Sequence, residues 1–548
     1  MPVVRERDQP GVVYTPPEVA SAMVRVALEP LIRGRTAREL CALRVCDFAV
    51  GEGAFVVEVV RVLAEAMTAA GVSRAREQAG RCVVGVDIDA RAVATARLAL
   101  GDLDLRVADA LAVDWAAAFP DVFARGGFDA VVGNPPYIRQ EWLGAGKLRA
   151  GFATAGGVAD LYVYFVELAH RIARPGGRYC VITPNKWLTA AYGRELRGFL
   201  AEAGSVEGVI DLGRAAVFAE ADAFPCVTWG TVGEPVRTPI RAARIATGTI
   251  SEALAAGIPH PRERWTAEPW YIDAPADRAL IDRLERTWPA LGDVLPDKPA
   301  RGVVTGCNRA FVIDRATRER LLADNPSSAA LIRPLLKGRD VRRFRAAASE
   351  RWILLVDRGT SLDDHPAITA HLAGFRAALA PRPADHLGPW SGRKPGTYRW
   401  CELQDPVGAL AASRAPRLFY QDIQSGPACA LDRSGDLVPD TTVWILPSAD
   451  PVLLALLNSS LYGWYAQRRF PPALGGSVRP KREYMRALPV AAPDPALRAR
   501  ITGLVEEALA ATTPALDAAL DAAIFSAYAL SPRERALVIG QPPLTIIE

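Results

Sequence analysis

The sequence predicts an α/β fold with a doubly wound, mostly parallel sheet, because short β-type runs alternate with helical stretches from residue 43 to about 232. Acidic or small polar residues follow several of these runs, at the strand ends where open α/β sheets bind ligands. The alternation stops near residue 235, and turns, aromatic residues and basic clusters follow up to about 490. We therefore expect a sheet domain first and a mixed α+β domain after it.

Seven segments are predicted strands because each is short, rich in β-type residues and bounded by turn or helix signals. In chain order they are "LRVCDFA" (43–49), "CVVGVD" (82–87), "LRVAD" (105–109), "FDAVVG" (128–133), "RYCVITP" (178–184), "VEGVIDL" (206–212) and "CVTWGTV" (226–232). A helix is predicted after the first strand, since Phe55, Val59 and Leu63 recur at helical spacing.

The rest of the chain divides into two further parts. The segment "EPVRTPIRAAR" (234–244) is expected to be a linker or a last hairpin. Apolar residues return to helical spacing after residue 490, and "SPRE" (531–534) is a capping box with proline at the first helical position. We expect a sheet domain over 1–245, a second domain over 246–490 and a helical segment over 491–548.

Bulk composition excludes several classes of protein. The chain has 548 residues and a formal net charge of +4, too small to indicate an acidic partner by itself. Its eight cysteines form no CxxC pair and its five histidines do not cluster, so we expect neither a disulfide framework nor a metal site. No apolar stretch approaches the ~20 residues that cross a bilayer, and the N-terminus has no signal-peptide core. We expect free thiols, a cytoplasmic protein and no membrane partner.

A candidate ligand loop, "DFAVGEGAF" (47–55), lies where the first strand meets its helix. Gly51 and Gly53 allow a tight turn and a close approach to a ligand, although such pairs also occur in ordinary turns. Asp87 ends the second strand, where an acid can accept both hydroxyls of a ribose, and Asp109 ends the third, where an acid can accept from an adenine amino group. Either acid alone is also a plausible helix N-cap, but three such strand ends at one edge favour a ligand.

The ligand that these residues describe contains a ribose and an adenine. The chain has no GxxxxGK[ST] loop for a nucleoside triphosphate, which favours S-adenosylmethionine. NAD stays possible from the glycines alone, but the loop lacks the third glycine of the dinucleotide fingerprint.

The fourth strand runs into "NPPY" (134–137) at the same edge of the sheet. The amide oxygen of Asn134 is a neutral acceptor, and Pro135 and Pro136 stiffen the backbone so that the Pro135 carbonyl can serve as a second acceptor. Tyr137 adds a flat face for stacking. Two acceptors and a stacking plane suit an exocyclic amino group on a planar base, although a rigid turn that packs a tyrosine has the same sequence.

With these motifs the chain resembles the γ-class, Taq-type adenine-specific DNA methyltransferases of restriction-modification systems. The resemblance covers nearly the whole chain and follows the family's motif order. Its segments are "YTPPEV" (14–19), "DFAVGEGAF", "NPPY", "ADLYVYFVELA" (159–169), "ITPNKWL" (182–188), "VFAEADAFPC" (217–226), "GVVTGCNRAFVID" (302–314), "IRPLLKGRDVRRF" (332–344) and "LLALLNSSLYGWY" (453–465). It implies a class I S-adenosylmethionine-dependent methyltransferase fold of seven strands, followed by a target recognition domain that binds double-stranded DNA.

The resemblance also assigns roles to residues of the sheet domain. Its cofactor-binding residues are Thr15, Asp47, Ala49, Gly51, Gly53, Asp87, Asp109 and Asn134. "TPPE" is at the same time a capping box for the first helix. Asn134 and Pro135 are expected to bind the target amino group of an extruded adenine, with Tyr137 on one face of the base. Phe218 is the candidate for its other face, and Phe224 is the rival.

Basic residues interleaved with aromatic ones favour a nucleic-acid surface in the second domain, although any single cluster is more often solvated. The expected DNA contacts are Lys186, Lys337, Arg339, Arg342, Arg343, Arg393, Lys394, Arg479 and Lys481.

Two other functions stay open. Glutamine N5 methyltransferases also use NPPY on a planar amide nitrogen, but they need no large basic domain. A DNA-binding defence protein with a decayed site is the non-catalytic alternative, and the intact NPPY argues against it. We find no nuclease motif in the chain, so we expect methylation without cleavage, alongside a separate nuclease or other defence proteins.

Overall fold

The structure is a computed structural model that describes residues 15–540 except for 102, 139–150, 155–158, 214–223, 234, 246–248, 348–349 and 387. The chain forms two compact units, Met1–Ala274 and Pro275–Glu548, which we call unit 1 and unit 2. Unit 1 ends almost thirty residues after the boundary expected at 245. No helix of the described residues is long and apolar enough to span a membrane.

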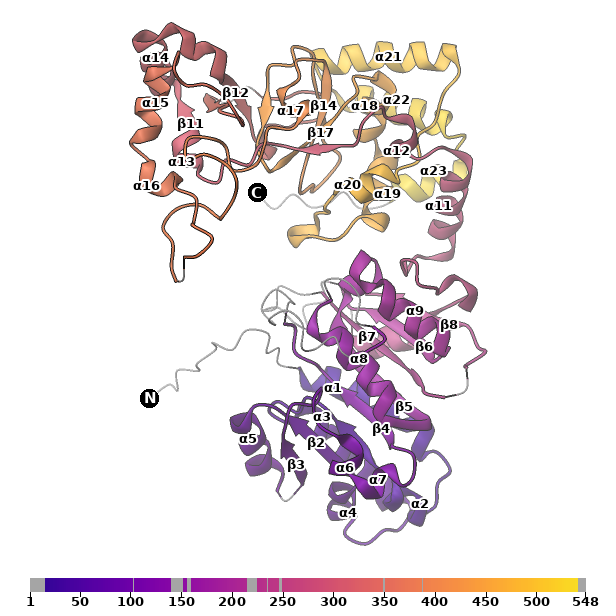
Figure 1. Ribbon diagram of the computed structural model, residues 1–548. Coiled ribbons are helices and arrows are strands. Elements are labelled where there is room, and N and C mark those ends of the chain that lie inside the picture. Colours follow the sequence, from indigo (N-terminus) through magenta and orange to yellow (C-terminus); the bar gives the residue numbers. More distant parts are fainter. Residues whose placement is uncertain are drawn as a thin grey trace, which may run out of the picture. The chain divides into compact units, whose positions relative to one another are not determined.

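Unit 1 is built around one twisted sheet, whose strands alternate with helices along the chain (Figure 1). The strands are β1 (Val45–Asp47), β2 (Val83–Asp87), β3 (Asp104–Val107), β4 (Phe128–Gly133), β5 (Ala173–Pro184), β6 (Val206–Asp211), β7 (Pro225–Thr231), β8 (Ile240–Arg244) and β9 (Ile258–His260). The helices are α1 (Pro17–Ile32), α2 (Ala37–Ala42), α3 (Ala54–Ala69), α4 (Ala75–Arg81), α5 (Ala90–Leu100), α6 (Trp115–Ala118), α7 (Pro120–Phe123), α8 (Leu161–Ile172), α9 (Arg194–Ala203) and α10 (Ile250–Ala256).

The strand order is β3-β2-β1-β4-β5-β7-β6-β8-β9. Strands β1 to β5 pair in parallel, and β7 alone among the first seven runs antiparallel to its neighbours β5 and β6. All seven predicted strands are confirmed within a few residues, except that β5 begins five residues earlier than expected. The order reverses between β1 and β4, so the carboxyl ends of these two strands form the switch point where ligands bind in open α/β sheets.

Alternate residues of each strand point to opposite faces of the sheet. In β4, Ala130 and Val132 pack with α1, α3 and α10, while Val131 packs with α6 to α9 on the other face. Helices therefore bury both faces, as the parallel pairing requires.

The segment 234–244 differs from the prediction. It is neither a linker nor a hairpin, because Ile240–Arg244 forms β8 and pairs in parallel with β6. Alternation of exposed Arg241 with buried Ile240 and Ala242 suits a strand near a sheet edge. Because β8, β9 and α10 extend this sheet and its core, unit 1 continues past residue 245.

Unit 2 contains two four-stranded sheets and many helices. The strands are β10 (Ala300–Arg301), β11 (Val312–Asp314), β12 (Ile332–Leu336), β13 (Arg351–Leu354), β14 (Arg417–Gln421), β15 (Cys429–Asp432), β16 (Val438–Pro439) and β17 (Val443–Leu446). Their orders are β10-β17-β14-β15, which is antiparallel throughout, and β11-β13-β12-β16, where β12 and β16 pair in parallel. This arrangement agrees with the mixed α+β domain expected from the sequence.

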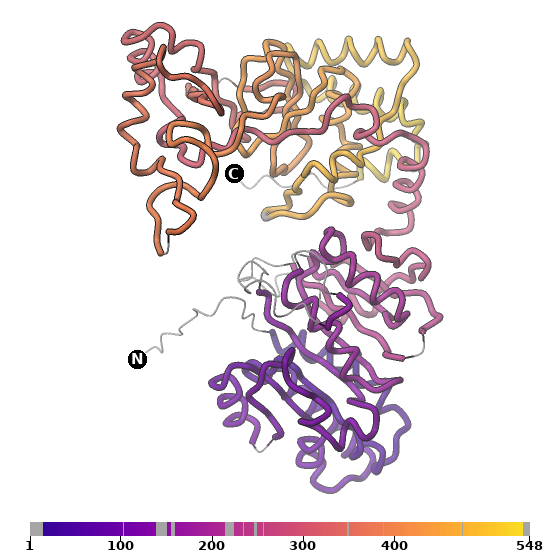
Figure 2. The backbone as a smooth tube through the Cα atoms, viewed as in Figure 1, coloured from indigo at the N-terminus to yellow at the C-terminus, as the bar shows by residue number. Residues whose placement is uncertain are grey.

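Helices occur throughout the sequence of unit 2, and the longest lie near its two ends. They are α11 (Pro275–Thr287), α12 (Leu291–Val294), α13 (Asn308–Phe311), α14 (Arg315–Asp324), α15 (Pro366–Ala373), α16 (Arg376–Leu379), α17 (Ala409–Ala412), α18 (Pro451–Leu457), α19 (Ser460–Arg469), α20 (Arg482–Arg486), α21 (Pro495–Ala510), α22 (Pro514–Ala527) and α23 (Pro532–Ile539). The first and last lie side by side, where Arg283 of α11 pairs with Glu534 of α23 at 2.9 Å (Figure 2).

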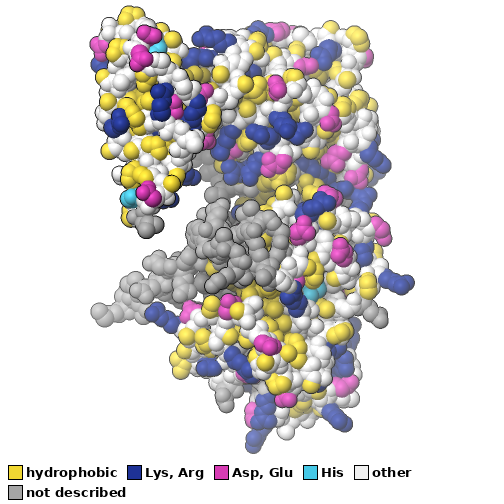
Figure 3. Space-filling view, in the orientation of Figure 1, with side chains coloured by type: hydrophobic (Ala, Val, Ile, Leu, Met, Phe, Trp, Pro, Cys, Tyr) yellow, Lys and Arg dark blue, Asp and Glu magenta, His cyan; other side chains and the backbone are white. Residues whose placement is uncertain are grey.

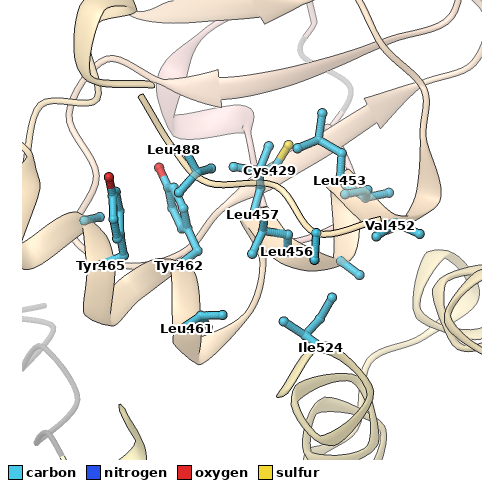
Figure 4. Packing of buried hydrophobic residues seen from close by; sticks show 14 of the residues in the cluster. Cys429, Val452, Leu453, Leu456, Leu457, Leu461, Tyr462, Tyr465, Leu488 and Ile524 are labelled. Atoms are coloured by element: carbon cyan, nitrogen blue, oxygen red, sulfur yellow. The ribbon is translucent and has the colours of Figure 1, made fainter. Parts of the chain in front are cut away.

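One apolar core joins the C-terminal helices to the rest of unit 2. Leu453, Leu457 and Tyr462 of α18 and α19 pack around Cys429 of β15 and Ile524 of α22 (Figure 4). The helical segment expected over 491–548 therefore shares its core with the domain before it. Its last helix, α23, begins with the predicted capping box between Ser531 and Glu534.

A buried histidine of α8 predicts acid sensitivity. The His170 ring contacts Val166 O at 3.0 Å and Ser205 Oγ at 2.7 Å, and burial lowers its pKa to about 4. Since the folded pKa lies below the unfolded value near 6.5, the unfolded chain binds the proton first, and stability falls as pH drops from about 6.5 to 4, by at most about 3 kcal/mol. Urea unfolding of the wild type and His170→Gln should diverge in this window, the variant losing less. Parallel curves would contradict the assignment.

Candidate active site

The loop that follows β1 is held against the end of β2. Val50 N donates to Val86 O at 3.2 Å, and Gly51 N donates to Asp87 Oδ2 at 2.8 Å. Gly53 adopts φ +93° at the start of α3, a conformation that side-chain-bearing residues rarely take. A Cβ on Gly51, at φ +51°, would meet no atom within 4 Å, so open space lies over this turn.

Asp47 is the least satisfied carboxylate of the loop. Its Oδ1 accepts from Ala49 N at 3.0 Å, whereas Oδ2 is buried and has no hydrogen-bond partner among the described residues. Burial, and to a smaller extent the charge of Asp87, raises the pKa of Asp47 to about 7. A buried carboxylate oxygen without a donor suits a ligand that brings an N–H donor or a positive charge.

The two other predicted acids lie at the neighbouring strand ends. Asp87 accepts from Gly51 N and from Asp89 N, the latter at 2.9 Å, so both of its oxygens face backbone donors. Asp109 is exposed two residues after β3, and its Oδ1 accepts from Leu111 N at 3.0 Å. The structure thus places Asp47 and Asp87 at the ends of the adjacent strands β1 and β2, and Asp109 two residues after the end of β3.

The sequence pattern did not identify Ile88, an exposed isoleucine beside Asp87, as a candidate site residue. Ile88 is 72% exposed, although it directly follows a buried strand and precedes Asp89, the N-cap of α5. A large apolar side chain in this position offers a packing surface for a ring bound near Asp87. The sequence did contain one indication of this role, because Ile88 lies between the acid that ends β2 and the residue that caps α5.

These residues fit S-adenosylmethionine. The orphaned Asp47 Oδ2 can accept from its α-ammonium group, the open turn at Gly51 admits its methionine part, and Asp87, Ile88 and Asp109 offer contacts to a nucleoside. No cluster of His, Cys, Asp or Glu arranged to hold a metal occurs in the part of the chain that the structure describes.

Asp47→Asn should change stability and ligand binding in opposite directions. Because burial raises the folded pKa above the unfolded value of 3.8, the ligand-free protein loses stability as pH rises from about 4 to 7, by at most about 4 kcal/mol. The neutral amide should therefore raise the melting temperature at pH 8 but not at pH 4, while weakening S-adenosylmethionine binding in calorimetry. A variant that melts below the wild type at pH 8 without ligand would contradict this account.

The NPPY corner lies directly beside the cofactor loop. Val132 of β4 pairs with Asp47, and Gly133 pairs with Val181 of β5. A Cβ on Gly133 would come within 3.1 Å of both Asp47 Oδ1 and the Phe48 ring. Glycine therefore ends the strand because any side chain here would press on the cofactor loop.

Thr15 orients the amide of Asn134. Asn134 Nδ2 donates to Thr15 Oγ1 at 3.1 Å, so the amide oxygen lies on the side away from Thr15. The predicted capping box at "TPPE" is wrong, because α1 begins at Pro17 with Pro16 at its N-cap and makes no side-chain cap bond. The buried Thr15 hydroxyl contacts the NPPY corner instead, and this contact joins the residues directly before α1 to the site.

Tyr137 presents its ring from a fixed position. It is half-buried and packs edge to face on Tyr162, with centroids 6.5 Å apart, and the Tyr162 hydroxyl bonds to Tyr192 at 2.6 Å. The Tyr137 hydroxyl is buried without a hydrogen-bond partner among the described residues, and burial raises its pKa far above the usual value. The hydroxyl is therefore an inert part of this side chain.

Asn185 forms hydrogen bonds to both ends of the segment between β6 and β7. Its Nδ2 donates to Asp211 Oδ1 at 2.8 Å at the end of β6, and its backbone N–H donates to Phe224 O at 2.6 Å. Phe224 is half-buried at the same sheet edge as NPPY, since β7 runs antiparallel. Phe218 lies outside the described residues.

The structure sorts the basic residues predicted to contact DNA. Exposed members are Lys186, Arg339, Arg342 and Lys394, and partly buried ones are Lys337, Arg479 and Lys481. Arg343 pairs with Asp517 at 2.7 Å and donates to Asn458 O at 3.0 Å.

Arg393 is corrected to a structural residue. It is 3% exposed, and its guanidinium donates to the backbone carbonyls of Leu379, Thr305, Glu402, Arg399 and Trp400. These bonds leave it no surface for DNA, so it ties together the loops on either side of it.

The fold and the site define the class of protein as a class I S-adenosylmethionine-dependent methyltransferase. Comparisons with known proteins agree. The Eco57I restriction-modification methylase model matches residues 101–218. The Type II methyltransferase M.PaeR7I of Pseudomonas aeruginosa is 27% identical over 80% of this chain and 77% of its own length. M.XhoI of Xanthomonas vasicola is 25% identical over 88% of this chain and 91% of its own.

Solved structures share the fold across both units. The Type IIL restriction-modification enzyme MmeI in complex with DNA superposes with a TM-score of 0.63 and 13% identity, over 95% of this chain and 75% of that one. Over most of its length the chain is therefore similar to Type II methyltransferases, and part of unit 1 is similar to a restriction-modification methylase.

Proposed function

We propose that the chain transfers a methyl group from S-adenosylmethionine to the exocyclic N6 of an adenine extruded from duplex DNA, as the modification component of a restriction-modification or related defence system. The position of NPPY beside the cofactor loop carries this proposal. The bond from Asn134 to Thr15 and the close approach of Gly133 to Asp47 fix the corner at the switch point of the sheet.

The chemistry of the corner suits an aromatic amine. The lone pair of such a nitrogen is delocalised into its ring, which makes it a weak nucleophile. Asn134 Oδ1 and the Pro135 carbonyl would accept its two hydrogens and favour a pyramidal nitrogen whose lone pair is free to react. Oriented neutral dipoles then supply the catalysis, without a strong base.

The cofactor, when bound, supplies an electrophilic methyl group. Asp47, the Gly51–Gly53 turn, Asp87 and Asp109 would hold it, and Ile88 would pack on its adenine ring. On transfer the S–CH3 bond of the sulfonium would break as the N–C bond forms, S-adenosylhomocysteine would be the leaving group, and one amino proton would pass to solvent. No protein side chain has to gain a charge before attack.

An adenine in duplex DNA is out of reach of this corner, so the base must leave the stack at a cost of a few kcal/mol. Stacking on Tyr137 offsets part of that cost, and Phe224 or Phe218 is proposed for the opposite face. Phosphate contacts of unit 2 would offset more. An enzyme that methylates a protein glutamine needs no large second unit. The presence of unit 2 therefore favours DNA as the substrate.

Tritiated S-adenosylmethionine tests this proposal directly. The purified chain should label duplex DNA and leave a bacterial release factor unlabelled. Label on the release factor alone would point to glutamine N5 methylation, and no label on either would favour a non-catalytic protein. Unmethylated DNA should stay uncut when magnesium is added, because we propose that a separate nuclease cleaves the DNA.

A further inference from the structure

Arginines from two distant parts of the sequence, Arg301 on one side and Arg479 and Arg482 on the other, lie near the end of β14. Arg479 lies 2.6 Å from Asp422 Oδ2, and Arg301 lies 3.9 Å from the same oxygen. Trp444 Nε1 donates to Asp422 Oδ1 at 2.9 Å, and the guanidinium carbon of Arg482 lies 5.9 Å from the Trp444 ring. We call these five residues the Asp422 cluster.

The cluster carries an excess of positive charge toward solvent. Two guanidinium groups, those of Arg301 and Arg479, lie near one carboxylate that is 7% exposed, and a third, that of Arg482, lies over the neighbouring Trp444 ring. The side chains of Arg301 and Arg479 are 47% and 39% exposed, and Arg482 is exposed. The Arg479 Nε–H is buried and has no acceptor among the described residues. Elsewhere on unit 2, exposed pairs such as Arg433 with Glu506 and Arg414 with Asp436 are matched one to one.

The backbone beneath the cluster is fixed on several sides. Asp422 N donates to Thr442 O at 2.8 Å, and Gln421 Nε2 donates to Gly338 O at 2.7 Å. Gln424 and Val478 exchange two backbone hydrogen bonds of 2.9 and 2.8 Å. Between the buried Asp422 and Gln424, Ile423 is 51% exposed. The backbone that carries Asp422 is therefore preorganised, and the next residue along it exposes an aliphatic side chain.

We propose that the Asp422 cluster binds phosphates of the DNA backbone, with Arg301 and Arg482 as direct contacts, Arg479 held in place by Asp422, and Ile423 packed on the sugar edge. This inference rests on DNA being the substrate in the proposed function and adds where unit 2 contacts it. Lys and Arg side chains gather on the face of unit 2 over β17 and α20, the elements that supply Trp444 and Arg482 (Figure 3).

Duplex DNA explains the composition better than a small anion does. A free phosphate gains nothing from an exposed isoleucine, whereas a nucleic-acid backbone presents phosphate oxygens and apolar sugar edges side by side. Contacts to phosphates fix the position of a protein on the duplex and carry little sequence information, so we expect the cluster to bind matched and random duplexes alike.

The test compares Arg301→Ala/Arg482→Ala with Arg433→Ala in the full chain. Arg433 is exposed on the same unit but is neutralised by Glu506. Fluorescence anisotropy over a salt series should show that the double variant binds duplex about 10- to 100-fold more weakly, with a log–log salt slope smaller by about 2. The loss should be equal on methylatable and random duplexes, and Arg433→Ala should bind like the wild type.

Kinetics separate this surface from the active site. The double variant should raise KM for DNA while leaving kcat at saturating DNA and S-adenosylmethionine affinity unchanged. An unchanged salt slope would overturn the proposal, and so would a loss confined to the cognate sequence, which indicates base reading. If the wild type binds DNA with the full log–log salt slope but transfers no methyl group, the proposed function is contradicted while the proposed DNA-binding surface is supported.

Discussion

Asn134→Ala is expected to reduce methyl transfer to a small residual rate while leaving the binding of both substrates nearly intact. The substitution removes one of the two acceptors proposed to hold the target amino group, and the loss of one oriented dipole at a reacting centre costs about 10² to 10³ in kcat. Single-turnover transfer of tritium to DNA measures the rate. Calorimetry with S-adenosylmethionine and anisotropy with DNA measure the two affinities.

Thr15 offers a graded control for Asn134. Thr15→Val keeps the shape of the side chain but removes the acceptor for Asn134 Nδ2, which lies 3.1 Å away. It should lower kcat by about 10- to 100-fold, through lost orientation alone, and Thr15→Ser should restore most of the rate. If Asn134→Ala turns over like the wild type, the amide is not part of the catalytic corner.

Tyr137→Ala is expected to lower kcat/KM by about 10- to 100-fold, since the stacking of one base on an aromatic side chain is worth about 1 to 3 kcal/mol. Tyr137→Phe is the matched control. It keeps the ring and removes only a hydroxyl that is buried without a partner among the described residues, so it should retain full activity and equal or greater thermal stability.

A fluorescent base reports the proposed stacking separately from transfer. With 2-aminopurine at the target position, the wild type and Tyr137→Phe should show the emission of an extruded base, and Tyr137→Ala should show less extrusion. A Tyr137→Phe variant as inactive as Tyr137→Ala would mean that the hydroxyl, and not the ring face, matters.

The sheet of unit 1 could be predicted because its signals are local. Each strand is a short β-type run, and Gly51, Asp87 and Asn134 lie at strand ends that a parallel sheet brings to one edge. The strand after residue 235 escaped prediction because Pro235 and Pro239 interrupt its approach, and its pairing with β6 and β9, which are distant in sequence, makes it a strand.

Charge clusters were predicted less well, since sequence does not reveal burial. Arg343 and Arg393 belong to basic runs, yet one is paired with Asp517 and the other is enclosed by carbonyl oxygens. The Asp422 cluster shows the opposite case. Antiparallel pairing of β10, β17 and β14 brings Arg301 to Asp422, although 121 positions in the sequence separate them.

Thr15 illustrates a third limit. The pattern "TPPE" fits a capping box, but the helix begins one position later than the pattern requires, and the hydroxyl contacts a residue 119 positions away. A local motif cannot reveal a competing long-range partner. Ile88 was overlooked for a related reason, because an apolar residue next to a strand is normally assigned to the core and here is exposed.

The central claim is that the NPPY corner delivers a methyl group to the amino nitrogen of adenine. Mass spectrometry of nucleosides from duplex DNA treated with the chain and S-adenosylmethionine tests it most directly, with Asn134→Ala as the blank. The account predicts abundant N6-methyl-2′-deoxyadenosine from the wild type and at most a trace from the variant under the same conditions. N4-methyl-2′-deoxycytidine as the sole product, or equal product from the variant, would contradict it.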